Sequence, residues 1–248
     1  MVADNPEAKN ELLGSMLTSL EFVLNPRVLA DEASKRQISD HLTNGGLVLI
    51  RDALQETVAM RMFECLDQFS DWKVHEDYQT NFHYHHHNIY EQPLYPPDLN
   101  WCRGIFDSEL TKSLIQTLSH RDCTGETSFS ASWYLPGDYS LPHDDLPGYE
   151  GAYRQVAFIW HLSRNWQPHW GGDLFWCRKN RYITPSFNSL ILFNVSPENS
   201  HHVTQVSPFA AAKRLAISGW WTSKTENQLG LDEDLVSSTG EQELLELI

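Results

Sequence analysis

The segment of residues 127–145, TSFSASWYLPGDYSLPHDD, marks the point where the chain changes character. From here on, short runs rich in Val, Ile, Phe and Trp alternate with turn residues such as Gly, Pro, Asn and Asp. Such a series predicts a barrel or sandwich of short strands. The runs are SFSASWYL (128–135), YRQVAFIWHL (153–162), GDLFWC (172–177), NSLILFNV (188–195), HHVTQV (201–206) and RLAISGWW (214–221).

Upstream of this segment the pattern predicts helices around one early strand. Asp31 is a candidate N-cap for a helix that stops at Gly45, and Asp107 or Ser108 is a candidate N-cap for the last long helix. Three prolines, Pro93, Pro96 and Pro97, predict a loop-rich stretch over 72–103. The expected helices are 10–20, 31–46, 56–69 and 106–120, and the expected strand is 47–54.

We expect one domain in three parts, because all-β barrels often reach this length as single units. Residues 1–126 form a helical and strand region that packs on the core, and residues 127–222 form the catalytic core. Residues 223–248 form an acidic C-terminal tail, in which LLELI (244–248) could dock as a short helix.

Composition limits the partners and the compartment. The formal net charge is −15, which disfavours nucleic acid and anionic membranes and favours a basic protein or a neutral small molecule. No secretory signal opens the chain, and no apolar run reaches the roughly 18 residues of a membrane span. No C-x-x-C pair is present, so we expect a cytoplasmic protein with free thiols. The cysteines are Cys65, Cys102, Cys123 and Cys177.

The candidate metal ligands begin in LPHDD. In an extended segment, alternate side chains share a face, so His143 and Asp145 can point at one metal while Asp144 points away. The pair HH follows 56 residues after Asp145, beyond further predicted strands that could return the chain to the same place. His201 and His202 would lie on opposite faces, so only one of them can bind. Two His and one carboxylate on Fe(II) leave open positions for a bidentate 2-oxo acid and O2.

Two further residues are candidate binders of a carboxylate. Arg214 opens the predicted strand after the HH pair, and a buried guanidinium can clasp the far carboxylate of 2-oxoglutarate with two parallel hydrogen bonds. Tyr134, nine residues before His143, could donate its phenol hydrogen to the same carboxylate. The ordinary alternatives are a surface arginine and a core tyrosine.

These motifs together resemble the prolyl-4-hydroxylase-like branch of the Fe(II)/2-oxoglutarate-dependent dioxygenase superfamily. The resemblance covers about residues 127–222, and GGLVLIRDAL (45–54) is a weaker match. It implies a mainly β fold with flanking helices, an α+β arrangement around a double-stranded β-helix of the jelly-roll, cupin-like type. Fe(II) is the implied metal, with 2-oxoglutarate and O2 as co-substrates and ascorbate as a candidate reductant.

The resemblance also assigns roles to residues. The family's distal ligand opens an H-x-V-x-x-V run, which His201, Val203 and Val206 match, so His201 is preferred to His202. Arg214 and Tyr134 fall on the family's 2-oxoglutarate residues. The interval of 13 residues from His201 to Arg214 is slightly long, and the extra residues around SPFAAAK (207–213) should form a strand-to-strand turn.

The reaction that the resemblance implies is hydroxylation of a C–H bond, with a prolyl residue of a protein as the leading substrate. A hydroxylase of a small molecule or free amino acid is the first alternative, and a non-catalytic cupin-like metal- and ligand-binding protein is the second. The oligomeric state is left open. The run NFHYHHHNIY (81–90) would place His83, His85 and His87 on one face of a strand, as a second metal site or as a border of the substrate entrance.

Overall fold

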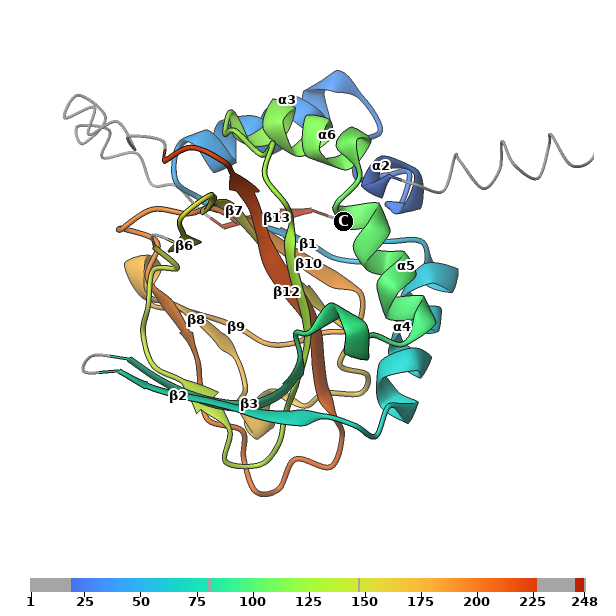
Figure 1. Cartoon of the computed structure of the whole chain (residues 1–248), viewed down its shortest axis with the longest axis vertical. Helices are drawn as coiled ribbons and strands as arrows, with labels where there is room; N and C mark the ends of the chain where they lie inside the picture. Colours follow the sequence, from blue (N-terminus) through green and yellow to red (C-terminus); the bar gives the residue numbers. More distant parts are fainter. Residues whose placement is uncertain (1–18, 80–81, 147, 227–243, 248) are drawn as a thin grey trace, which may run out of the picture.

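A computed structural model of the chain describes residues 19–79, 82–146, 148–226 and 244–247. The molecule has a large β-sheet, a small β-sheet facing it, and helices on the outer side of the large sheet (Figure 1). The predicted class, mainly β with flanking helices, is confirmed. The helices are α2 (Leu20–Val23), α3 (Glu32–Thr43), α4 (Glu56–Gln68), α5 (Pro97–Phe106) and α6 (Glu109–Ser119), with short 3₁₀ turns η1 (Gln92–Leu94), η2 (Pro168–Trp170) and η3 (Cys177–Lys179).

The large sheet has the strand order β13-β1-β10-β7-β12-β4-β3-β2, with β5 paired to β3 and β6 paired to β7. All its pairs are antiparallel except β1 with β13. Its strands are β1 (Leu47–Ile50), β2 (Lys73–Gln79), β3 (Phe82–Ile89), β4 (Ser128–Tyr134), β5 (Tyr139–Ser140), β6 (Gly148–Tyr149), β7 (Ala152–His161), β10 (Ser189–Asn194), β12 (Arg214–Ser223) and β13 (Leu245–Leu247).

The second sheet is small and has the strand order β11-β8-β9. Its strands are β8 (Leu174–Trp176), β9 (Arg181–Ile183) and β11 (His201–Val203). Leu174 and Trp176 from this sheet share an apolar cluster with Leu49 and Phe193 from the large sheet, so the two sheets pack face to face. The space between them is therefore enclosed by strands on both sides.

Side-chain alternation on the central strands separates a helix-facing core from the interior between the sheets. On β7 and β12, Phe158, Trp160, Leu215 and Trp221 pack in the main core with the helices, and all are fully buried. Phe106 from α5 joins them. Because strand side chains alternate, the intervening positions, including Arg214, face the interior. The alternation thus directs polar side chains of β12 toward the small sheet.

Local signals explain where the helices begin and end. Asp31 accepts a hydrogen bond from the Ser34 backbone N–H at 2.8 Å, as an N-cap does, and Gly45 takes a positive φ of 73° just beyond the end of α3. Of the two candidate caps of α6, Ser108 is the one used, since it accepts from the Thr111 N–H. The helix expected over 10–20 lies almost entirely outside the described residues.

Two expectations were wrong. The stretch 72–103 is not mainly loop, because it holds the β2/β3 hairpin and the start of α5, whose first residue is Pro97. Proline is favoured there, since the first helical residue has no use for a backbone N–H within the helix. Residues Leu245–Leu247 form a strand and not a short helix, because they pair in parallel with β1. No helix among the described residues is long and apolar enough to cross a membrane.

We expect Phe158→Ala to lower the free energy of unfolding by about 3–5 kcal/mol, because its ring fills space between Phe106 and Trp221 that the fold cannot close. Ring centroids lie 4.8 Å and 4.7 Å apart in these two contacts. Urea denaturation measures the change. The control is Phe209→Ala at a side chain that is 81% exposed, which should stay within about 0.5 kcal/mol of the parent chain.

Candidate metal centre

His143, Asp145 and His201 come together between the two sheets. One ligand atom from each lies within 4.8 Å of the others. The Nε2 of His143 and the Nε2 of His201 each lie 3.6 Å from an oxygen of the Asp145 carboxylate. Asp145 and His201 are buried and His143 is half-buried, and two imidazoles with one carboxylate at this separation fit a divalent transition metal such as Fe(II).

A pair of backbone hydrogen bonds holds the first ligand against the last. The His143 N–H donates to the His201 carbonyl at 2.9 Å, and the His201 N–H donates to the His143 carbonyl at 2.8 Å. His143 belongs to the loop after β5, whereas His201 opens β11. The bridge therefore fixes the spacing of the two imidazoles through the main chain, without help from a metal.

The imidazoles are oriented by carbonyl groups behind them. The Nδ1 of His143 lies 2.7 Å from the Leu141 carbonyl oxygen, and the Nδ1 of His201 lies 3.0 Å from the Asn199 carbonyl oxygen. Since a carbonyl only accepts, each Nδ1 carries the proton, and each Nε2 presents a lone pair toward Asp145. Burial, together with the neighbouring His201, lowers the pKa of His143 to about 4, so its imidazole is neutral at physiological pH. Neutral imidazole is the form that binds a metal.

Asp145 reaches the metal position for a different reason from the one predicted. It is not in a strand: its φ is 70°, a left-handed value that is uncommon for a residue other than glycine. Asp144 is not part of the metal-ligand group, and its carboxylate accepts the Leu146 N–H within a turn at 3.0 Å. The side chains of Asp145 and Asp144 are separated by turn geometry and not by strand alternation.

Arg154 supports Asp145 and was missed by sequence reasoning. Its guanidinium donates to the Asp145 carbonyl oxygen at 3.0 Å and lies 4.0 Å from the carboxylate. It also lies over the Trp220 ring, 3.8 Å from the ring centroid, which is a cation–π contact. A sequence signal that could have placed Arg154 near Asp145 was the turn at Glu150 and Gly151, which connects the paired strands β6 and β7.

His202 faces away from the centre. Its ring packs 4.9 Å from the ring of Phe175, and its Nδ1 lies 3.8 Å from the Cys177 Sγ, on the other side of β11 from His201. The interior side of the strand is occupied by His201, whose ring packs against Trp176 and Phe193. Of the histidine pair, the structure brings His201 and not His202 next to His143 and Asp145.

Arg214 and Tyr134 lie side by side, as paired residues of β12 and β4. The guanidinium carbon is 4.4 Å from the Tyr134 ring centroid, and Arg214 is only 2% exposed. Its Nε donates to the Gly172 carbonyl oxygen at 2.6 Å. Among the described residues, neither terminal amino group of Arg214 has a hydrogen-bond or ion-pair partner. A buried guanidinium with two free amino groups is arranged to receive a carboxylate.

The surroundings of Arg214 are shaped to admit its side chain. Gly172 has a φ of 66°, and a Cβ there would lie 2.9 Å from the Arg214 Cδ, so only glycine fits. Burial raises the pKa of Tyr134 to about 12, so its phenol stays protonated and can donate. The residues 207–213 form a turn between β11 and β12, as the long interval required.

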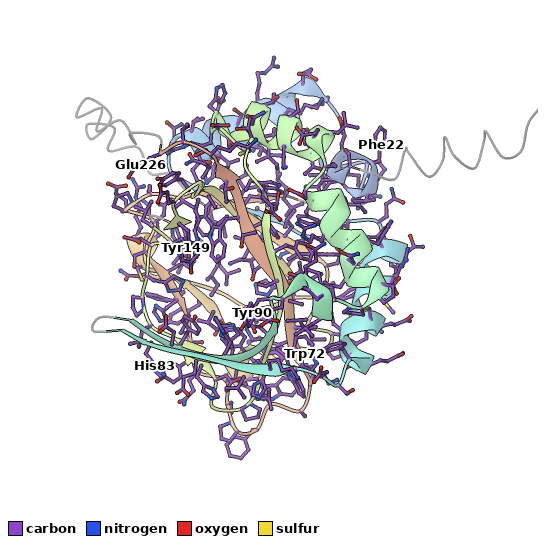
Figure 2. All side chains as sticks on the ribbon, viewed as in Figure 1. Phe22, Trp72, His83, Tyr90, Tyr149 and Glu226 are labelled. Atoms are coloured by element: carbon purple, nitrogen blue, oxygen red, sulfur yellow. The ribbon has the colours of Figure 1, made fainter. Side chains whose placement is uncertain are left out.

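The histidine run divides between the two faces of β3. His83, His85 and His87 share one face, as predicted, and His83 is labelled on the hairpin in Figure 2. The Nδ1 atoms of His85 and His87 lie 2.7 Å and 3.4 Å from the two oxygens of Asp138, a buried residue in the turn after β4. His86 points the other way and stacks on Tyr134 at 4.7 Å. Only the His143, Asp145 and His201 group meets metal-ligand spacing among the described residues.

Comparisons with known proteins agree with this architecture. Residues 129–222 match the family model of the 2OG-Fe(II) oxygenase superfamily. The chain is 34% identical over 120 residues to the prolyl 3-hydroxylase sudestada1 of Drosophila melanogaster, covering 42% of this chain and 22% of that protein. It is 31% identical over 150 residues to a prolyl 3-hydroxylase of Xenopus laevis, covering 56% of this chain and 26% of that protein. The matches thus span about a quarter or less of these relatives.

Solved structures show the same fold at low identity. A prolyl-4-hydroxylase of Pseudomonas putida superposes with a TM-score of 0.58 at 19% identity, covering 76% of this chain and 98% of that one. A prolyl hydroxylase of Trichoplax adhaerens, solved with a peptide fragment of hypoxia inducible factor, has a TM-score of 0.58 at 20% identity, covering 80% and 94%. These likenesses identify the two facing sheets as the double-stranded β-helix of 2OG oxygenases.

A facial group of two histidines and one aspartate inside a double-stranded β-helix defines the class of non-haem iron oxygenases. Residues 129–222 are similar to the 2OG-Fe(II) oxygenase superfamily, and the relatives and solved structures that share this similarity are prolyl hydroxylases.

We expect His201→Ala to weaken binding of Co²⁺ by about 100-fold or more, because it removes one of the three groups that could bind the ion. His202→Ala should keep the affinity of the parent chain within about threefold, because its ring faces Phe175. Calorimetric titration with Co²⁺ measures both. A His202→Ala chain that loses Co²⁺ binding as fully as His201→Ala would contradict the assignment.

Proposed function

We propose that the chain is an Fe(II)- and 2-oxoglutarate-dependent oxygenase that hydroxylates a prolyl residue of a protein substrate. The proposal is carried by two groups that lie in the interior between the sheets. One is the group of two histidines and one aspartate, and the other is the buried Arg214, whose terminal amino groups have no partner among the described residues. The first suits Fe(II), and the second suits the distal carboxylate of 2-oxoglutarate. A non-catalytic cupin-like protein would not account for a buried guanidinium whose terminal amino groups have no partner among the described residues.

The metal-binding residues would be His143, Asp145 and His201. Ferrous iron held there, with 2-oxoglutarate and O2, supplies oxidative decarboxylation to succinate and CO2, with one oxygen atom entering succinate and the other entering a C–H bond of the substrate. The carbonyls of Leu141 and Asn199 keep both imidazoles in the tautomer that binds. Two imidazoles and one carboxylate would leave coordination positions free for the co-substrates.

Arg214 and Tyr134 would hold the co-substrate. The two amino groups of Arg214 can donate in parallel to one carboxylate, and the protonated Tyr134 phenol can add a third donor. The contact of the guanidinium with the Tyr134 ring keeps it in place, since the ring face attracts the cation. The pair would hold the co-substrate by its far carboxylate, which would leave its 2-oxo acid end free to bind the metal.

Aromatic rings beside the centre would keep water out. Trp176 lies 6.0 Å and Phe193 lies 5.0 Å from His201, measured between ring centroids. Arg154, which packs over the Trp220 ring, would cover Asp145 through its hydrogen bond to the Asp145 carbonyl oxygen. A dry, rigid surrounding limits side reactions of the oxidising centre. No residue is needed as a general base, because the reaction takes a hydrogen atom and not a proton.

The proposed substrate rests on three considerations. The curated relatives named above are prolyl 3-hydroxylases, and one structural neighbour was solved with a peptide. The net charge of −15 favours a basic protein segment over a nucleic acid. A small molecule or a free amino acid remains the alternative substrate class, and ascorbate as reductant remains a prediction.

The proposal is tested by incubating the chain with Fe(II), 2-oxoglutarate and O2, with and without proline-containing peptides, and measuring succinate and a 16 Da gain in peptide mass. We expect peptides with basic residues beside the proline to stimulate succinate, and the Asp145→Ala chain to make none. Stimulation by free amino acids or small metabolites alone would support the alternative enzyme. Failure to form succinate under any condition would support a cupin-like binding protein.

We expect Arg214→Gln to raise the KM for 2-oxoglutarate by about 10- to 100-fold, the loss typical of a hydrogen bond to a charged group. Binding of Co²⁺ should be unchanged, because Arg214 is not a metal ligand. The matched control is Arg36→Gln on the exposed face of α3, which should leave the KM alone. A KM that is unaffected in Arg214→Gln would remove this residue from the co-substrate site.

A further inference from the structure

The outer face of the small sheet carries a row of three rings. His202, Phe175 and Tyr182 pair across β11, β8 and β9, and the ring centroid of Phe175 lies 4.9 Å from that of His202 and 4.6 Å from that of Tyr182. Because side chains alternate along a strand, this row lies on the opposite face of the sheet from Trp176 and His201. Tyr182 is 63% exposed. The row is therefore a surface separate from the metal centre.

The row ends at an open edge of the small sheet. In the order β11-β8-β9, β9 is the last strand, and within the part of the chain that the structure describes it pairs only with β8. In Figure 1, β8 and β9 lie on the side of the molecule away from α4 and α5. An edge strand presents backbone N–H and C=O groups with which another extended chain can pair. The edge of β9 is thus available for one more strand.

Positive charge is concentrated beside this edge. Arg178, Lys179 and Arg181 are all exposed, and none of them forms an ion pair with another described residue. Arg178 donates a hydrogen bond to the Gly45 carbonyl oxygen at 3.3 Å. Residues 174–197 contain no Asp or Glu, although the whole chain has a formal net charge of −15. The charge at this edge is therefore opposite in sign to that of the chain, and it favours an anionic partner.

The strand edge favours a polypeptide over a nucleic acid. Cations and rings alone would also suit a single-stranded RNA, whose phosphates pair with the cations and whose bases stack on the rings. An RNA has no row of backbone amides to pair with β9. An extended polypeptide pairs with the edge and places alternate side chains on the two faces of the sheet, where they reach the rings and the cations.

We propose that the edge of β9 binds an extended acidic segment of a partner protein, which adds a strand to the small sheet. Backbone pairing with β9 sets the register, Tyr182 packs against an apolar side chain of the segment, and the three cations pair with its carboxylates. The inference goes beyond the proposed function and does not rest on it, because none of these residues belongs to the metal group or to the proposed co-substrate site. The acidic segment is also distinct from the basic prolyl segment proposed as substrate.

The test titrates the full chain with a short dye-labelled peptide in which Glu and Val alternate and whose ends carry no charge, followed by fluorescence anisotropy. We expect Lys179→Glu with Arg181→Glu to weaken binding about 10-fold or more, because two exposed attractions become repulsions. The same double variant should gain affinity for a peptide of alternating Lys and Val. The matched control is Arg27→Glu with Arg36→Glu, which changes the net charge equally at other exposed positions and should keep the Kd within about twofold.

Strand addition has a readout of its own. Alternate N–H groups of a strand point to the same side, so N-methylation of one alternate set in the peptide blocks pairing with β9, whereas methylation of the other set does not. We expect one methylated peptide to lose binding and the other to keep it. Amide hydrogen exchange of Arg181–Ile183 should slow when the unmethylated peptide binds.

The aromatic contact is tested separately. Tyr182→Ala should weaken binding of the unmethylated peptide about fivefold or more, as the loss of a tyrosine at an interface does. Phe209→Ala removes another exposed ring, which is 81% exposed and lies in the turn before β12, and should leave the Kd unchanged. A Tyr182→Ala chain that binds as tightly as the parent chain removes Tyr182 from the surface and contradicts the proposal.

Other occupants give different results, and each overturns the proposal. Equal effects of the two methylations, whether loss or retention, exclude strand addition. An oligouridylate that binds through Lys179 and Arg181 while the acidic peptide does not would assign the surface to RNA. Peptide binding that appears only in a chain with Glu241→Gln and Glu243→Gln would assign it to the chain's own acidic residues. A parent chain that binds no acidic peptide leaves the edge without this partner, and the succinate assay still decides the proposed function independently.

Discussion

The arrangement depends most on the pair of backbone hydrogen bonds between His143 and His201. These residues are far apart in the chain, and the intervening segment contributes strands to both sheets. Between the two residues the chain passes through β7 and β10, which pair with each other, and through β8, which pairs with β11. The geometry of the centre is therefore a consequence of the whole barrel. It is set by main-chain groups, so it does not rely on the flexible ends of side chains.

The strands from β4 onward could be predicted from the sequence because their side chains alternate between a helix-facing core and the interior. The β2/β3 hairpin as a whole could not, although a strand was considered for the histidine run, since its residues are mostly polar or histidine on both faces. On one face of β3, His85 contacts Asp138, and on the other face His86 stacks on Tyr134. Neither contact requires apolar residues, so the sequence shows no apolar alternation there. The tail strand was missed for a similar reason: LLELI has too few residues to separate a helix from a strand.

The residues of the centre were also predictable to different degrees. The spacing of His143 and Asp145 is local, so the sequence displays it directly, although a left-handed turn and not a strand produces it. Arg154 carries no such local pattern. Its role follows from its contact with Trp220 on the neighbouring strand β12. Register between strands decides this pair, and register is not evident from one strand alone.

The parallel strand β13 has a consequence for how the molecule avoids self-association. It lies along β1, whose four residues are all buried and aliphatic, and the Arg51 N–H donates to the Leu247 carbonyl oxygen at 3.0 Å. Without it, β1 would be an open, flat, apolar edge offering unpaired amide groups to any passing strand. Residues Leu245–Leu247 thus cover the edge of β1, at the end of the sheet opposite to the polar hairpin.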